Sequence, residues 1–203
     1  MKTFIISDTH ESFENLTPEK DTELFIFTGD YGNSSKKTEK QFRKFIDYIK
    51  QLKIKSIIIP GNHDTFILAQ MAKAKNIIKD MSEDIYLLDN ESIIINDKKF
   101  FGLSNQESIL KKRESNFLEK ARKRYQKIEE DTEILLTHFP PYGILDLNNK
   151  NKNEGSIALL ERIDNLENLK YHFFGHIHEG YGVRNINNKK FINVSQEGFY
   201  VDL

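Results

Sequence analysis

Five short apolar runs in this chain each end in residues that can bind a metal ion. Such runs, rich in Ile, Leu and Phe and separated by longer amphipathic stretches, predict buried β-strands. Because ligands bind beyond the carboxyl ends of strands in open α/β sheets, five separate segments would bring polar side chains to one edge of a sheet. The residues at the ends of the runs are Ser7-Asp8-Thr9-His10, Thr28-Gly29-Asp30, Pro60-Gly61-Asn62-His63-Asp64, Thr137-His138 and Gly175-His176-Ile177-His178.

The alternation of predicted strands and helices indicates an α/β layered fold. No repeat or linker divides the chain, which is expected to form a single domain over residues 1–203. Asn96-Asp97-Lys98 and Asn187-Asn188 carry turn residues between strand-like runs, so each is expected to close a hairpin. Helices are expected at residues 36–52, from Asp64 or Thr65 onward, at 107–130 and at 156–165. Strands are expected at residues 3–7, 24–28, 56–60, 85–88, 92–96, 99–103, 133–137, 171–174, 190–194 and 199–201.

Two of the predicted helices have a defined apolar face. At 36–52 this face holds Phe42, Phe45, Ile46, Ile49 and Leu52, and at 156–165 we expect Ile157, Leu160 and Ile163 to point inward. Asp64 is expected either to cap the helix that follows it or to act at the site. His172, the histidine outside the motifs, starts a predicted strand and is expected to pack in the fold or face solvent.

The charges of the chain are nearly balanced, with 30 Lys and Arg against 31 Asp and Glu. That balance argues against binding to nucleic acid by overall charge, although residues 111–124 hold seven Lys or Arg and two Glu. We interpret this basic segment as a solvated helix face, with contact to a nucleotide or an RNA end as the alternative. No apolar stretch approaches the ~20 residues that cross a bilayer. The chain also enters a strand at once, with no room for a signal peptide, so a cytoplasmic protein is expected.

The chain has no cysteine, which excludes disulfides, thiolate ligands and a cysteine nucleophile. A metal ion must then be held by His, Asp, Glu or Asn, and such a donor set suits Mn, Fe or Zn. Two ions about 3.5–4 Å apart form a clamp for in-line attack at phosphorus. We therefore expect two divalent metal ions, with Mn preferred over Fe or Zn. The strand ends supply seven donors, more than one ion needs: Asp8, His10, Asp30, Asn62, His138, His176 and His178.

Three residues near the strand ends have expected roles of their own. Asp30 lies between two shorter donor motifs and is the natural bridging ligand. Asn62 is neutral, so its carbonyl oxygen can complete a coordination sphere while leaving the ions electrophilic enough to activate water. His63 is expected to protonate the leaving oxygen or to donate a hydrogen bond to the phosphate. The glycine before each of three motifs is expected to allow close approach of the backbone.

Taken in order, the motifs resemble the signature of the calcineurin-like metallophosphoesterases: Asp8-x-His10, Gly29-Asp30, Gly61-Asn62-His63-Asp64, His138 and Gly175-His176-x-His178. The resemblance implies a four-layer α/β/β/α sandwich with mixed sheets and two metal ions at its edge. It also implies that a metal-bridging hydroxide attacks phosphorus while His63 assists the leaving group. It assigns one ion to Asp8, His10, Asp30 and His178, and the other to Asp30, Asn62, His138 and His176.

Residues 138–146, 155–160 and 174–182 resemble the small single-domain MPPED-like phosphodiesterases of that family. The stretch after Gly29 lacks the Gly-Asp-x-x-Asp-Arg-Gly motif of the protein phosphatases, which disfavours that activity. The predicted function is therefore a dimetal phosphohydrolase, specifically a phosphodiesterase for a small or nucleotide-type phosphoester. The alternatives are a phosphomonoesterase, a nuclease for nucleic-acid ends, and a non-catalytic scaffold, which would be expected to lose ligand histidines. The sequence does not determine the substrate, the native metal or the oligomeric state.

Overall fold

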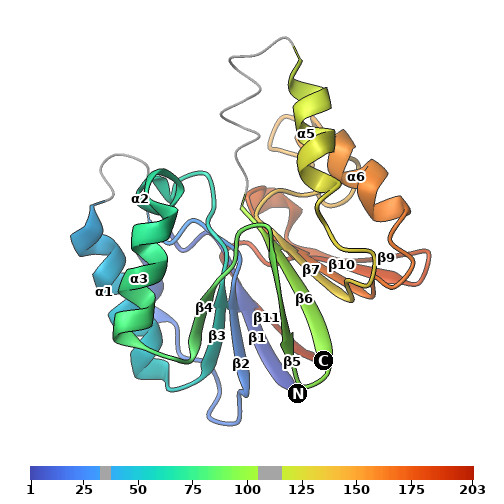
Figure 1. The fold of residues 1–203 in the computed structure, drawn as a ribbon. Helices are drawn as coiled ribbons and strands as arrows, with labels where there is room; N and C mark the ends of the chain where they lie inside the picture. Colours follow the sequence, from blue (N-terminus) through green and yellow to red (C-terminus); the bar gives the residue numbers. More distant parts are fainter. Residues whose placement is uncertain (33–37, 105–115) are drawn as a thin grey trace.

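The computed structural model describes residues 1–32, 38–104 and 116–203. These residues form two mixed β-sheets packed face to face, with helices on both outer faces (Figure 1). The first sheet has the strand order β11-β1-β2-β3-β4, in which only β11 is antiparallel to its neighbour. Its strands are β1 (Lys2–Ile6), β2 (Leu24–Phe27), β3 (Lys55–Ile58), β4 (Ile85–Leu87) and β11 (Phe199–Asp202).

The second sheet has the strand order β5-β6-β7-β8-β10-β9, with antiparallel strands at its two edges. All ten predicted strands are present. The hairpin expected at Asn187-Asn188 implied a strand before that turn, but no bounds were predicted for β9, whose middle residues are exposed at a sheet edge. Both predicted hairpins are confirmed, and each turn has two residues with positive φ, which Asn and Asp tolerate well. The strands are β5 (Glu91–Ile95), β6 (Lys98–Leu103), β7 (Ile134–Thr137), β8 (Tyr171–Phe174), β9 (Gly182–Ile186) and β10 (Lys189–Asn193).

Helices α1 (Glu39–Leu52), α2 (Thr65–Ala69) and α3 (Met71–Met81) cover the first sheet (Figure 1). Thr38 caps α1 in a capping box with Gln41, and the predicted apolar face of this helix is buried apart from the half-buried Leu52. The helix expected from Asp64 or Thr65 is divided in two, because Gln70 has a non-helical backbone with φ −139° and ψ 48°.

Helices α5 (Phe117–Tyr125) and α6 (Ile157–Asp164) cover the second sheet. The first part of the helix expected at 107–130 lies outside the described residues, and the described helix ends at Tyr125. The expectation for this helix is confirmed at Ile163, which is buried, and at Leu160, which is half-buried against the core. It is wrong at Ile157, which is 47% exposed because Ala158, Leu159 and Ile163 form the buried face of the helix. No helix within the described ranges is long and apolar enough to cross a membrane.

Strands that bury both faces account for the continuous apolar runs in the sequence. On β1, Phe4 and Ile6 pack with α1, whereas Ile5 faces the second sheet. On β7, Leu135 packs with α5 and α6, whereas its neighbours on both sides face the first sheet. Because successive side chains of a strand point to opposite faces, these runs fill three apolar layers. The fold is the expected four-layer α/β/β/α sandwich, and the carboxyl ends of its parallel strands meet at the end opposite the two termini (Figure 1).

Candidate metal centre

The loops that follow β1 and β2 run side by side at this end of the sandwich. The backbone N–H of Asp8 donates to Gly29 O at 2.9 Å, and the N–H of His10 donates to Asp30 O at 3.2 Å. The same pairing continues one residue further, between Glu11 and Tyr31, at 2.9 Å. These hydrogen bonds hold the first two motifs of the sequence against each other.

Four of the predicted ligands have a left-handed backbone conformation. Asp8, His10, Asp30 and His176 have φ values of 58°, 44°, 63° and 70°. This conformation costs most residues roughly 1–2 kcal/mol, although Asp tolerates it better than most, and such strain collects at functional sites. The surrounding hydrogen bonds therefore hold these side chains in a costly arrangement, which supports a functional role.

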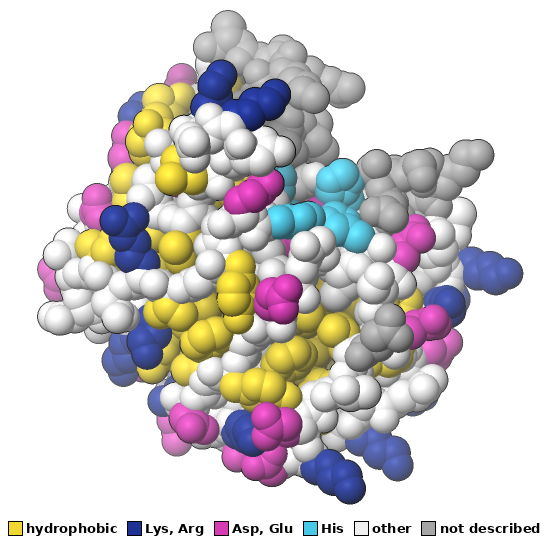
Figure 2. Space-filling view, turned by 180° about the vertical axis from the view of Figure 1, so that it is seen from behind, with side chains coloured by type: hydrophobic (Ala, Val, Ile, Leu, Met, Phe, Trp, Pro, Cys, Tyr) yellow, Lys and Arg dark blue, Asp and Glu magenta, His cyan; other side chains and the backbone are white. Residues whose placement is uncertain are grey.

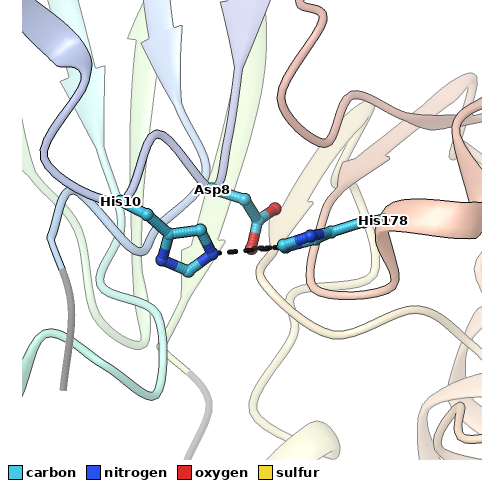
Figure 3. Close-up of side chains that lie close together, drawn as sticks. All are labelled: Asp8, His10 and His178. Carbon is cyan, nitrogen blue, oxygen red and sulfur yellow. Dashed lines mark hydrogen bonds and ion pairs between the residues drawn. The ribbon is translucent and has the colours of Figure 1, made fainter.

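The predicted ligands form two groups, Asp8 with His10 and His178, and Asp30 with His138 and His176. In each group the potential ligand atoms all lie within 4.8 Å of one another. Figure 3 shows the first group, in which His10 and His178 approach Asp8 from opposite sides. The Nε2 atoms of the two histidines are 3.2 Å apart, and His178 Nε2 lies 3.5 Å from Asp8 Oδ1.

The two groups are in contact with each other. Asp8 Oδ1 lies 3.9 Å from His138 Nε2, and Asp30 Oδ2 lies 3.1 Å from the same atom. Asp8, Asp30 and His138 are buried, whereas His10, His176 and His178 are partly exposed. The site is therefore closed on the side of the sheets and open to solvent on the other, where the histidines gather on the molecular surface (Figure 2).

The surroundings of the Asn62 side chain show whether this arrangement fits a metal ion. Its Oδ1 is buried and has no hydrogen-bond partner among the described residues. A buried acceptor without a partner costs roughly 1–3 kcal/mol, and a cation would remove that cost. The neighbouring residue brings Asn62 to Asp30, because the His63 N–H donates to Asp30 Oδ1 at 2.7 Å. Carboxylate, amide and imidazole donors together fit Mn, Fe or Zn.

The electrostatics of the site favour charged carboxylates and a charged imidazole when no cation is bound. Burial alone would lower the pKa of His138, but the Asp30 and Asp8 carboxylates raise it to about 9. Burial alone would raise the pKa of Asp8, but His138 and the hydrogen bonds from His178 and the His176 N–H hold it below its usual value. A metal ion needs a neutral imidazole, so it would have to replace the His138 proton.

His63 lies at the opening of the site, with its side chain 36% exposed. Its Nε2 is 3.9 Å from Asp30 Oδ2, and its ring stands edge-on to that of His10 at 5.7 Å between centroids. The imidazole is therefore beside the two groups and accessible to a substrate.

Asp64 occupies the N-cap position of α2 but makes no capping hydrogen bond with its side chain. Its buried carboxylate instead accepts from the backbone N–H groups of Asp30 at 2.8 Å, Tyr31 at 3.1 Å and Gly61 at 2.8 Å. The expected cap is therefore wrong, because the loop N–H groups compete for this carboxylate. Through these hydrogen bonds Asp64 joins the second and third motifs.

The glycines that precede the predicted ligands have little space for a side chain. A Cβ on Gly175 would lie 2.2 Å from Ser7 Oγ and 2.3 Å from Asp8 Oδ2, which leaves space for glycine alone. Gly29 has φ +106°, which side chains rarely adopt. A Cβ on Gly29 would lie 2.5 Å from Gly61 N, and one on Gly61 would lie 2.2 Å from Asp30 Oδ1, so the expected close approach of the backbone is confirmed at all three positions.

Two residues outside the metal-binding groups support the site. His172 is fully buried, which confirms one of its two expected placements, and its Nε2 lies 2.8 Å from Thr137 Oγ1. Burial lowers the pKa of His172 to about 3. Ser195, which no motif of the sequence pointed to, donates from Oγ to Asp8 Oδ2 at 3.0 Å.

The family model for calcineurin-like phosphoesterases matches residues 1–180. With a four-layer sandwich and two Asp and His groups at its edge, the chain belongs to the calcineurin-like phosphoesterase family, a class of metal-dependent phosphoester hydrolases. The resemblance inferred from the motif order is thus confirmed.

The chain is 30% identical over 207 residues to UPF0046 protein K07C11.7 of Caenorhabditis elegans, covering 97% of this chain and 70% of that protein. It is 28% identical over 225 residues to metallophosphoesterase domain-containing protein 1 of Homo sapiens, covering 94% and 64%. It is 27% identical over 172 residues to the probable glycerophosphodiester phosphodiesterase GpdQ of Arcobacter nitrofigilis, covering 81% and 59%. The chain thus spans only part of each relative's length.

A solved structure shares the fold at low sequence identity. The crystal structure of TT1561 of Thermus thermophilus matches with a TM-score of 0.64 and 13% identity, covering 95% of this chain and 88% of that one. The similarity therefore concerns the arrangement of sheets and helices.

Proposed function

We propose that this site holds two divalent metal ions and that the chain is a phosphodiesterase for a small or nucleotide-type phosphoester. The observation that carries the proposal is the pair of contacting groups, each with one buried aspartate and two histidines, at one edge of the sandwich. The unpartnered Asn62 Oδ1 supports this residue as a further ligand among the described residues. One ion would take Asp8, His10, Asp30 and His178, and the other would take Asp30, Asn62, His138 and His176.

Asp30 would be shared between the ions. Its Oδ2 faces His138 at 3.1 Å, and its Oδ1 is held by the His63 N–H. Mn is the expected ion, with Fe and Zn as alternatives that the donor set also suits. When bound, the ions would polarise the phosphoryl oxygens and lower the pKa of the attacking water.

His63 would act on the substrate from the open side of the site. Its partly exposed imidazole lies beside Asp30 and His10, so it can reach a phosphoester that enters where the histidines are exposed. It would donate a proton to the leaving oxygen or a hydrogen bond to a phosphoryl oxygen. Asn62 would contribute by completing the coordination sphere without adding negative charge.

The choice of a diester is supported by the similarity to the probable glycerophosphodiester phosphodiesterase. The basic segment adds little support for a nuclease, since Arg122, Lys123 and Arg124 are paired with Glu161, Glu119 and Asp89. Residues 111–115 of that segment lie outside the described residues.

The test is an assay of the purified full chain with Mn²⁺ on bis(4-nitrophenyl) phosphate and on 4-nitrophenyl phosphate. We expect Mn²⁺-dependent turnover that favours the diester. His63→Ala should lower kcat by at least about 100-fold, the usual size of general acid catalysis, and Asn62→Ala should also abolish most turnover. Asn185→Ala, an exposed position on β9, is the matched control and should retain activity.

Two results would contradict the proposal in different ways. Turnover that favours the monoester would make the chain a phosphomonoesterase with the same site. If the chain shows no turnover with Mn, Fe or Zn, the proposed hydrolase activity is wrong, and a non-catalytic scaffold is the remaining alternative.

Two further expectations belong to the proposal. A single domain over residues 1–203 is supported by β11, which pairs with β1 and so joins the last strand to the first. A cytoplasmic location stays a prediction, and fluorescence of the tagged chain in its own cell would test it.

A further inference from the structure

We propose that Asn193 and Ser195 are positioning residues, which orient Asp8 and the loop of His176 and His178 for metal binding. This inference rests on the proposed function, because it concerns the same site. Both residues lie beyond residue 180, where the match to the family model ends. The family assignment therefore says nothing about them.

The two oxygens of Asp8 have different surroundings. Oδ2 accepts from Ser195 Oγ at 3.0 Å and from the His176 N–H at 2.9 Å. Oδ1 faces His178 Nε2 at 3.5 Å and His138 Nε2 at 3.9 Å. A carboxylate with two donors on one oxygen is held against rotation and presents its other oxygen to the histidines. Ser195 thus helps to decide which oxygen of Asp8 is available to an ion.

Ser195 is itself held where the two sheets come together. It forms an isolated parallel bridge with Ser7, the residue before Asp8, and the Gln196 N–H donates to Ser7 O at 3.0 Å. Ser195 is 1% exposed, so its hydrogen bond to Asp8 is shielded from water. The segment after β10 therefore connects the strand end that carries Asp8 to the second sheet.

Asn193 connects Ser195 to the loop that carries His176 and His178. Its Oδ1 accepts from the Ser195 N–H at 3.1 Å. Its Nδ2 donates to Ile177 O at 2.9 Å and to Leu145 O at 3.2 Å. Ile177 lies between His176 and His178, so this fully buried amide fixes the backbone from which both histidines extend. The amide thereby links the residue that holds Asp8 to the loop that carries two predicted ligands.

Loss of a partner that orients a metal ligand typically costs 10–100-fold in metal affinity or activity. Ser195→Ala would remove one of the two donors on Asp8 Oδ2 and free the carboxylate to turn. Asn193→Asp keeps the shape and the acceptor for Ser195. It replaces the amide donors with an oxygen that would repel the carbonyls of Ile177 and Leu145.

The experiment measures Mn²⁺ affinity of the full chain by isothermal titration calorimetry, and the Co²⁺ absorption spectrum of the same variants. Ser195→Ala and Asn193→Asp should each bind Mn²⁺ about tenfold more weakly or worse, with altered Co²⁺ bands. The matched control is Ser56→Ala. Ser56 is equally buried, its Oγ donates to Ile54 O at 2.8 Å, and it lies at the start of β3, away from the site. This control should match the wild type in both readouts.

The outcomes separate the inference from the proposed function. If the wild type binds two ions and the Ser195 and Asn193 variants bind as tightly as Ser56→Ala, with unchanged Co²⁺ bands, the inference is overturned and the proposed function stands. If the wild type binds no divalent ion, the proposed function fails and this inference fails with it. Should Asn193→Asp not fold because it buries an unpaired carboxylate, Ser195→Ala decides alone, because it removes a single oxygen atom.

Discussion

Two fully buried histidines of this protein should have opposite protonation states at neutral pH. His138 has Asp30 Oδ2 at 3.1 Å and Asp8 Oδ1 at 3.9 Å, and these carboxylates raise its pKa to about 9 against the effect of burial. His172 faces the Thr137 hydroxyl, and burial lowers its pKa to about 3. At pH 7 the metal-free chain should therefore hold a cationic His138 and a neutral His172.

The neighbouring atoms also define which ring nitrogens carry protons. His138 Nδ1 donates to Thr28 O at 2.9 Å, so Nε2 carries the proton that an ion would replace. Thr137 Oγ1 donates to Phe139 O at 2.6 Å and must accept from His172 Nε2, which leaves Nδ1 of that ring without a proton.

The perturbation that tests this reasoning is Asp30→Asn in the metal-free chain. The substitution keeps the size of the side chain and removes the nearest negative charge. An opposite charge at this distance shifts a pKa by about 1–3 units, so the pKa of His138 should fall by that amount. His172 does not contact Asp30 and should not change.

The assay is ¹⁵N-detected NMR of the imidazole groups, titrated from pH 4 to pH 10 in the wild type and the variant. We expect the His138 midpoint near pH 9 in the wild type, and Zn²⁺ should neutralise this ring at pH 7 by displacing the Nε2 proton. A wild-type midpoint near the ordinary value of about 6.5, or no response to Asp30→Asn, would refute the electrostatic reasoning.

Three further predictions follow from single contacts. Gly175→Ala should destabilise the fold by about 1–3 kcal/mol and weaken Mn²⁺ binding, because its Cβ would lie 2.3 Å from Asp8 Oδ2. An unchanged free energy of unfolding in urea would contradict this prediction. Asp64→Asn should cost roughly 1–3 kcal/mol, since an amide cannot accept all three loop N–H groups that the carboxylate binds; an unchanged unfolding midpoint would show that these bonds matter little. His172 has a folded pKa below its unfolded value, so it destabilises the fold as pH falls below about 6.5. Between pH 7 and pH 5 the free energy of unfolding of the wild type should fall by about 2 kcal/mol more than that of His172→Gln. The same fall in both proteins would argue against a neutral buried ring.

Most of the fold was predictable because the strands are buried on both faces and read as continuous apolar runs. The bounds of β9 were not, since Val183, Arg184 and Asn185 are exposed on an edge strand and show no apolar pattern, although the turn at Asn187-Asn188 implied a strand before it. The break between α2 and α3 was also not predictable from the sequence. Gln70 is an ordinary helix former by propensity, yet its backbone is non-helical in the folded chain.

The meeting of the metal-binding motifs was predictable because parallel strands end at the same edge of a sheet. The left-handed backbone at Asp8, His10, Asp30 and His176 was not, since nothing in these residue types requires it. The bond from Ser195 to Asp8 spans 187 positions of the chain and belongs to no motif. The opposite pKa directions of His138 and His172 depend on neighbours that only the folded chain brings together.

The proposed function requires that the two Asp and His groups bind a pair of ions. Crystals of the full chain grown with Mn²⁺ and measured at wavelengths on both sides of the manganese absorption edge would locate these ions. Two anomalous peaks are expected, one against Asp8, His10 and His178 and one against His138, His176 and Asn62, with Asp30 between them. Peaks elsewhere on the molecule, or a single ion that contacts only one of the groups, would contradict the claim.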